Sequence, residues 1–319
     1  MKKLISLIIA LALCLSLCAC GAAPVEPTLP TEPEEETTPS IGSIINKGVL
    51  QYPASNALFK YNIYDTYVEI TEYIGDNAAE EVIVPAMLEN LPVYVVDHNV
   101  FNKCDVKSIV FEDGIYTIHS EFSGSLVSVR LPSTLDFVGS GTFKNCYALE
   151  TVIIPEGIDS IQFQAFMHCQ ALKEITIPST VTRLSSETFA YCTALETVVL
   201  PQGLKLVDDQ AFISCESLKT LILPDTLEEI GYAAFQGTGL TSIEIPASVK
   251  KIHSSVFTAC ESLQEVWVYS QEFELIPQEG LSVALLFSQC PDDLVVHGKP
   301  ASTIAQACAT ENIYFEVIK

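Results

Sequence analysis

The chain repeats itself every 23 residues over most of its length. Two copies read "LETVIIPEGIDSIQFQAFMHC" (149–169) and "LETVVLPQGLKLVDDQAFISC" (195–215). A period between 20 and 29 residues indicates stacked structural repeats rather than a globular alternation of elements. We therefore predict a solenoid in which each unit contacts its two neighbours. Prolines mark the register, at a spacing of 23 residues and finally 22: Pro132, Pro155, Pro178, Pro201, Pro224 and Pro246.

Each unit begins with a short alternating segment. In "LETVVL" (195–200), Leu195, Val198 and Leu200 would point inward, and Thr197 and Val199 outward, which is typical of a strand. The proline ends the strand because it has no N–H for a ladder. Stacking predicts a parallel sheet of about ten short strands, from 82–84 to 294–296. A second extended piece and a turn or helical stub would form the other side of each unit.

The motif "AFxxCxxLxxIxIP" resembles the BspA-like leucine-rich repeats of bacterial surface proteins, and the resemblance covers about 61–319. It implies a parallel-sheet solenoid, display at the cell surface, and adhesion or protein binding. The opening of the array and its close, "GKPASTIAQACATENIYFEVIK", look like those of the family. We expect an N-terminal cap over 46–80, the solenoid over 81–298, and a C-terminal cap with a helix over 299–319.

The first 45 residues have a different character. "MKK" is followed by an apolar run over 4–19, which is short for a spanning helix and typical of a signal peptide (1–19). "LCAC" (17–20) resembles the lipobox of bacterial lipoproteins, which implies a lipid on Cys20 and attachment to the outer face of the cell membrane. An ordinary secretory signal and an uncleaved anchor helix remain alternatives. The remainder of 20–45 is rich in Pro, Glu and Thr and reads as a disordered tether.

Seven repeat cysteines lie three residues after a phenylalanine, and disulfides, metal ligation, catalysis and packing could each explain them. Parallel Cβ vectors about 5 Å apart disfavour regular disulfides. A straight file does not converge on one metal ion, and equivalent copies do not single out a nucleophile. A small, mostly apolar thiol suits a tight inner corner, so we predict packing. The predicted structural ladder comprises Cys146, Cys169, Cys192, Cys215, Phe143, Phe166, Phe189 and Phe212.

The remaining sequence favours binding over catalysis. A formal net charge of −24 disfavours nucleic acid as a partner. We find no catalytic, cofactor or metal motif, and therefore predict a non-enzymatic protein that binds a protein or a glycan. An uptake-associated lipoprotein that binds a glycan or solute is the alternative. The outward strand positions form a weakly charged stripe, although β-branched residues also simply suit exposed strands. The candidate ligand-binding residues are Thr151, Ile153, Thr197, Val199, Thr220, Ile222 and Trp267.

Overall fold

The computed structural model describes residues 50–277 and 285–318. Contacts divide the chain into two units, Met1–Ile44 and Ile45–Lys319, and every described residue belongs to the second. The predicted signal peptide, the lipid-bearing Cys20 and the tether therefore lie outside the described residues. Within the described part, no helix is both long and apolar enough to cross a membrane.

The array begins with an antiparallel meander. Strands β1 (Leu50–Ser55), β2 (Phe59–Tyr64) and β3 (Val68–Tyr73) pair in sequence. Phe59, Tyr61 and Ile63 are buried at alternate positions, so one face of β2 closes the end of the core. β3 then pairs in parallel with β6 (Leu91–Val96), which forms a hairpin with β5 (Met87–Leu88). The meander thus covers the first coil with strands whose backbone groups are hydrogen-bonded to one another, so the coil is not left as an open end of the array.

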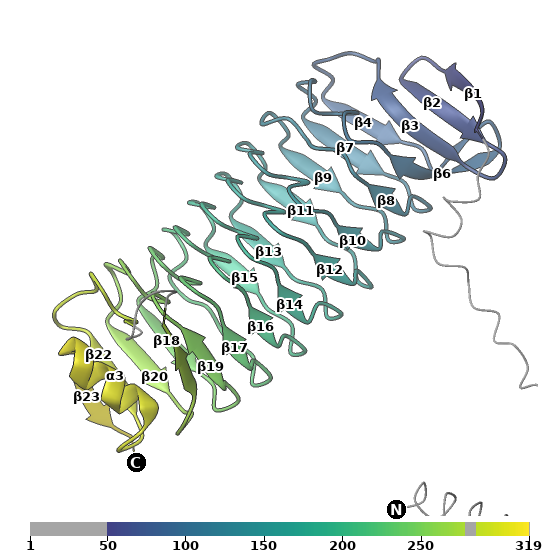
Figure 1. Ribbon diagram of the computed structural model, residues 1–319. Coiled ribbons are helices and arrows are strands. Elements are labelled where there is room, and N and C mark those ends of the chain that lie inside the picture. The colour runs from purple at the N-terminus through teal and green to yellow at the C-terminus, as the bar shows by residue number, and fades with distance from the viewer. Residues whose placement is uncertain (1–49, 278–284, 319) are drawn as a thin grey trace, which may run out of the picture. The chain divides into compact units, whose positions relative to one another are not determined.

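The first face of the solenoid carries the predicted parallel strands (Figure 1). They divide into three ladders, because no ladder joins β11 to β13 and residues 219–224 form no strand. The first ladder contains β4 (Glu81–Val84), β7 (Ser108–Phe111), β9 (Ser128–Arg130) and β11 (Thr151–Ile153). The second contains β13 (Glu174–Thr176) and β15 (Thr197–Val199). The third contains β18 (Ser242–Ile245), β20 (Glu265–Val268), β22 (Val295–Gly298) and β23 (Tyr314–Val317).

The second extended piece of each unit forms a second parallel sheet on the opposite face. β8 (Thr117–Ile118) pairs with β6, and seven further strands form one unbroken ladder. These are β10 (Phe137–Val138), β12 (Ser160–Ile161), β14 (Arg183–Leu184), β16 (Leu206–Val207), β17 (Glu229–Ile230), β19 (Lys251–His253) and β21 (Glu274–Ile276). The predicted turn or helical stubs are turns in the described repeats. From the coil of Phe143 onward these turns pass through the left-handed region, as at His168 (φ 64°) and Tyr191 (φ 60°).

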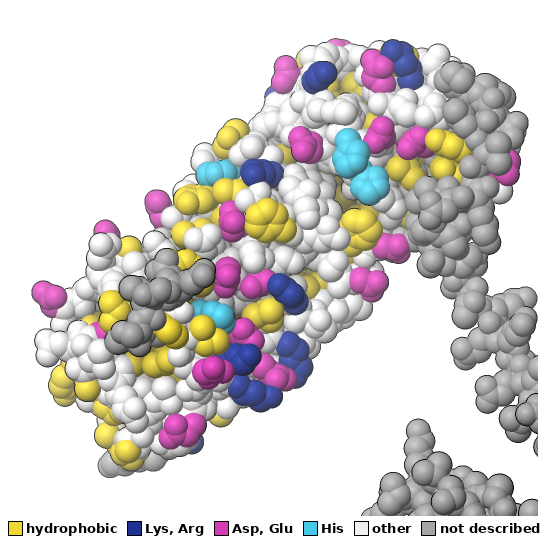
Figure 2. All heavy atoms as spheres, viewed as in Figure 1, with side chains coloured by type: hydrophobic (Ala, Val, Ile, Leu, Met, Phe, Trp, Pro, Cys, Tyr) yellow, Lys and Arg dark blue, Asp and Glu magenta, His cyan; other side chains and the backbone are white. Residues whose placement is uncertain are grey.

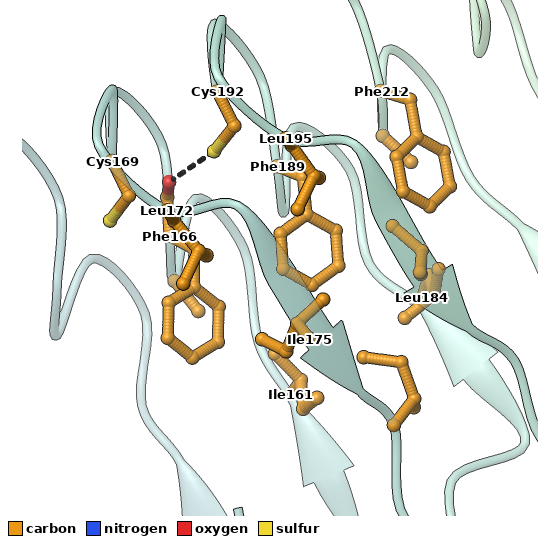
Figure 3. Close-up of a cluster of buried hydrophobic side chains, with 14 of the residues drawn as sticks. Ile161, Phe166, Cys169, Leu172, Ile175, Leu184, Phe189, Cys192, Leu195 and Phe212 are labelled. Atoms are coloured by element: carbon orange, nitrogen blue, oxygen red, sulfur yellow. Dashed lines mark hydrogen bonds between the residues drawn. The ribbon is translucent and has the colours of Figure 1, made fainter. Parts of the chain in front are cut away.

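The core between the two faces contains a continuous column of nine phenylalanine rings. Neighbouring ring centroids lie 5.0–5.9 Å apart, and the ring planes are within 19° of parallel. Phe166, Phe189 and Phe212 each come from an equivalent position of successive coils (Figure 3). All three are fully buried, as are Leu172 and Leu195 beside them. The predicted solenoid with one inward-facing file per repeat position is confirmed.

The last coils close with a helix and a final strand. α3 (Thr303–Glu311) begins at Ser302, whose side chain accepts a hydrogen bond from the backbone N–H of Ala305. It ends at Asn312, which adopts the left-handed conformation common after helices. The Glu311 carboxylate accepts the backbone N–H groups of Leu286 (2.7 Å) and Phe287 (2.9 Å). This contact ties the C-terminal cap to the coil that contains Phe287.

Candidate binding face

The cysteines form a file of hydrogen-bond donors between coils. The thiol of Cys192 donates to the backbone carbonyl of Phe166 in the preceding coil, at 3.1 Å (Figure 3). Cys146, Cys169, Cys215, Cys260 and Cys290 repeat this contact with Phe122, Phe143, Phe189, Phe235 and Phe257, at 3.0–3.7 Å. The carbonyl of Phe166 also accepts the N–H of Cys169 within its own coil. Two partners, one in each coil, are thus found for the carbonyls of Phe143, Phe166, Phe189 and Phe257.

The environment of the thiols favours a structural role. All eight cysteines of the described residues are free. Burial raises the pKa of the Cys146 and Cys290 thiols to about 12, so both stay protonated at neutral pH and remain donors. Where the motif lacks its cysteine, Thr238 donates to the carbonyl of Phe235 at 2.8 Å. Among the described side chains, no group of three or more His, Cys, Asp or Glu is placed to hold a metal ion.

The outward residues of the first face form a stripe along the array. The side chains of Ile153, Val199 and Ile222 are 67%, 51% and 83% exposed. Thr151, Thr197 and Thr220 are exposed in the parallel file beside them. We call these six residues the outward stripe. These exposed β-branched side chains occupy equivalent positions on the coils that flank β13 and on the following coil, and they provide a semi-apolar surface that no described segment covers.

Trp267 is placed differently from the rest of the candidate set. It lies on the outward side of β20, but its ring is stacked on His297 of β22, with centroids 3.8 Å apart and planes 9° from parallel. Its Nε1 donates to Glu265 at 3.3 Å. His297 is itself buried and lies 3.4 Å from the Glu316 carboxylate. Trp267 is half-buried in this packing, and two further strands extend the face beyond it.

Two shallow grooves lie where the ladders of the first face are interrupted. The smaller, of about 290 Å³, follows the opening between β11 and β13 and is lined by Ile153, Glu174, Thr176, Thr197 and Val199. The inward-facing Val152, Ile154 and Ile175 also contribute to its lining, as an opening between strands requires. The larger, of about 660 Å³, lies over 220–225 and β18, beside Ile222. The outward stripe therefore borders both grooves.

The second face carries many charged side chains of both signs, unlike the outward stripe. Lys205 and Lys250 both pair with Glu228, at 3.0 and 2.5 Å. Arg183 pairs with Asp208, and the imidazole of His253 lies 2.9 Å from Glu229. Figure 2 shows Lys, Arg, Asp and Glu side chains gathered together over β16, β17 and β19. Several charges on this face are matched between coils, whereas the six residues of the outward stripe are uncharged and have Arg130, Glu174 and Glu244 beside them on the first face.

The repeat pattern alone could not locate the interruptions of the first sheet. The segment "LKTLILP" (218–224) has the same alternation as "LETVVLP" (195–201), and only the latter forms a strand. Glu174 occupies an outward position equivalent to Thr151 and Thr197, as the registers of β9, β11, β13 and β15 show. A charged residue in a file of hydroxyls is a signal that could have marked the smaller groove.

Comparison with known proteins agrees with this architecture. No curated protein matches the chain. A leucine-rich repeat protein from Bacteroides ovatus is similar in structure, with TM-score 0.59 and 24% identity over 84% of this chain and 77% of that one. A leucine rich cell surface protein from Faecalibacterium prausnitzii has TM-score 0.55 and 18% identity over 84% and 95%. The leucine-rich repeat protein of T. pallidum has TM-score 0.51 and 22% identity over 58% and 89%.

These structural similarities establish the fold. The sequence itself matches the BspA type leucine rich repeat region in six copies, over 95–218 and 182–282. The matched segments span more than half of the chain and contain all but the last member of the phenylalanine column and of the cysteine file. The chain belongs to the family of BspA-type leucine-rich repeat proteins.

Proposed function

We propose that the protein is a surface-displayed binding protein, whose solenoid recognises another macromolecule through the outward stripe of its first face. The observation that carries this proposal is the contrast between the two faces. On the second face, charged side chains of neighbouring coils form ion pairs with each other. The first face presents the exposed side chains of Ile153, Val199 and Ile222 beside two grooves. Semi-apolar surface that is rimmed by polar groups is typical of protein interfaces.

The proposed location is the outer face of the cell membrane. It rests on the lipobox-like "LCAC" (17–20) and on the Pro- and Glu-rich segment that follows it. The similar Faecalibacterium protein is described as a cell surface protein, which agrees with this proposal. Replacing Cys20 by Ala should release the full-length protein from the membrane fraction after a carbonate wash. A variant that stays with the membrane would exclude lipid attachment at this residue.

The glycan- or solute-binding alternative requires a concave site with several convergent polar groups. The grooves of the first face are open, and a macromolecule matches such a surface better than a small solute does. Arrays of extracellular-matrix proteins and of glycans, probed with the purified 45–319 unit, compare the two classes directly. Binding confined to mono- or disaccharides would favour the alternative.

The face itself is tested with a double variant, Val199→Asp with Ile222→Asp. Both side chains point outward, so the variant should keep its fold and its thermal transition. Capture of an array hit should weaken at least tenfold, or about 1.4 kcal/mol. The matched control is Phe163→Asp, which also places a carboxylate at an exposed apolar position but lies beyond the end of β12, on the second side of the coil. Equal capture by the double variant and the wild type would exclude this face.

A further inference from the structure

We propose that the groove between β11 and β13 is a recognition site for an arginine side chain, presented by an extended polypeptide segment with apolar neighbours. This inference rests on the proposed function and specifies the chemistry of the partner. It starts from Glu174, the one ionisable residue among those that line the smaller groove.

Glu174 is exposed and has no hydrogen-bond or ion-pair partner for its carboxylate among the described residues. On the second face, by contrast, Asp208, Glu228 and Glu229 are each held by a basic group of a neighbouring coil. Lys173 precedes Glu174 in the chain, yet it neither pairs with it nor lines the groove. Glu174 also lines the adjoining groove over β7, β9 and β11 together with Arg130, but no ion pair joins these two side chains. The unpaired carboxylate provides a counter-charge for a cation of a partner.

The walls of the groove restrict which cation fits. Ile153 and Val199 flank the carboxylate with apolar surface, and Thr176 and Thr197 supply hydroxyl groups. Because β11 and β13 form no ladder with each other, their facing edges also offer peptide carbonyls. A guanidinium has five N–H donors and a flat, weakly hydrated apolar surface. It can pair with Glu174, donate to carbonyls and hydroxyls, and pack against Ile153 at once, whereas a compact ammonium can satisfy fewer of these groups.

The surrounding charge favours the approach of such a segment. Between residues 54 and 318 the chain carries 12 Lys and Arg against 35 Asp and Glu. This excess raises the local concentration of cationic partners and speeds their association. In the partner segment, β-branched side chains on either side of the arginine would cover Ile153 and Val199. These two residues occupy equivalent strand positions two coils apart. The favoured partner is thus an extended segment with arginine between apolar residues.

The probe is a fluorescent nine-residue peptide of alternating valine and threonine with a central arginine. The matched peptide carries citrulline at the centre, which keeps the shape of the side chain and removes its charge. Binding of both peptides to the 45–319 unit is measured by anisotropy for the wild type and for Glu174→Gln. We expect the arginine peptide to bind the wild type at least tenfold more tightly than the citrulline peptide does. In Glu174→Gln that preference should largely disappear.

Two controls separate this site from general attraction to an acidic protein. Glu216→Gln removes another exposed carboxylate that lies off the first face, next to Cys215, and should leave the preference for arginine intact. Lys173→Gln should not weaken the arginine peptide. The proposal is overturned if no binding occurs up to about 1 mM, if Glu216→Gln acts like Glu174→Gln, or if the preference survives in Glu174→Gln. Loss of array capture in Val199→Asp with Ile222→Asp, together with unchanged capture in Glu174→Gln, would retain the binding face and reject the arginine site.

Discussion

The phenylalanine column makes Phe189→Ala the sharpest test of the fold's energetics. Phe189 is fully buried, and its ring lies between those of Phe166 and Phe212, with both centroid distances 5.5 Å. Truncation to Ala removes the six ring carbons from the middle of a closed column. The neighbouring coils are held in register by the continuous second sheet, by the pairing of β13 with β15 and by the cysteine file, so they cannot collapse into the space.

The expected cost follows from this geometry. Burial and cavity terms for a Phe-to-Ala change amount to about 3–5 kcal/mol. Two stacked ring contacts are lost as well, each worth about 0.5–1.5 kcal/mol beyond area, although this partly overlaps with the first term. We therefore expect a loss of about 4–5 kcal/mol in the free energy of unfolding. Because each coil contacts only its neighbours, the variant should also reduce the cooperativity of unfolding.

The measurement is urea unfolding followed by far-ultraviolet circular dichroism, with Phe163→Ala as the matched control. Phe163 is 44% exposed and takes no part in the column, so its truncation should cost less than about 1 kcal/mol. A Phe189→Ala cost below about 1.5 kcal/mol, or equal costs for the two variants, would show that the column does not behave as a rigid core.

Three further predictions concern the cysteine file. Thiol titration of denatured, unreduced protein should find most of the eight cysteines of the described domain free, and three or more disulfides by mass spectrometry would contradict the packing role. Cys192→Ser should cost about 1–3 kcal/mol, less than Phe189→Ala in the same urea experiment, because it buries a more polar hydroxyl. The folded-state pKa of Cys146 is raised from 9.0 to about 12, so the stability that this proton confers is fully present below pH 9 and is lost as the pH rises toward 12. Cys146→Ala should therefore lessen the alkaline decline in unfolding free energy by about 1.4 kcal/mol per pH unit, and an unchanged slope would contradict this burial.

Much of the fold was predictable because the same pattern of inward, outward and turn positions recurs in every repeat. Alternation in 195–200 predicted that Val198 points inward and Val199 outward, and the proline spacing predicted the register that brings Phe166, Phe189 and Phe212 together. The second extended piece was foreseen as an element but not as a continuous sheet. With two or three residues per strand it shows no periodicity, and only stacking between coils supplies its hydrogen bonds.

The candidate binding face was likewise predictable only in part. The alternation within each strand was enough to assign which side chains point outward, because neighbouring residues of a pleated strand face opposite sides. It singled out Ile153, Val199 and Ile222. Tertiary structure alone decided that the first sheet opens between β11 and β13 and over 219–224, that Glu174 remains unpaired there, and that Trp267 is covered by His297. Inter-coil spacing and the packing of one coil on the next arise from the whole stack, and no single repeat encodes them.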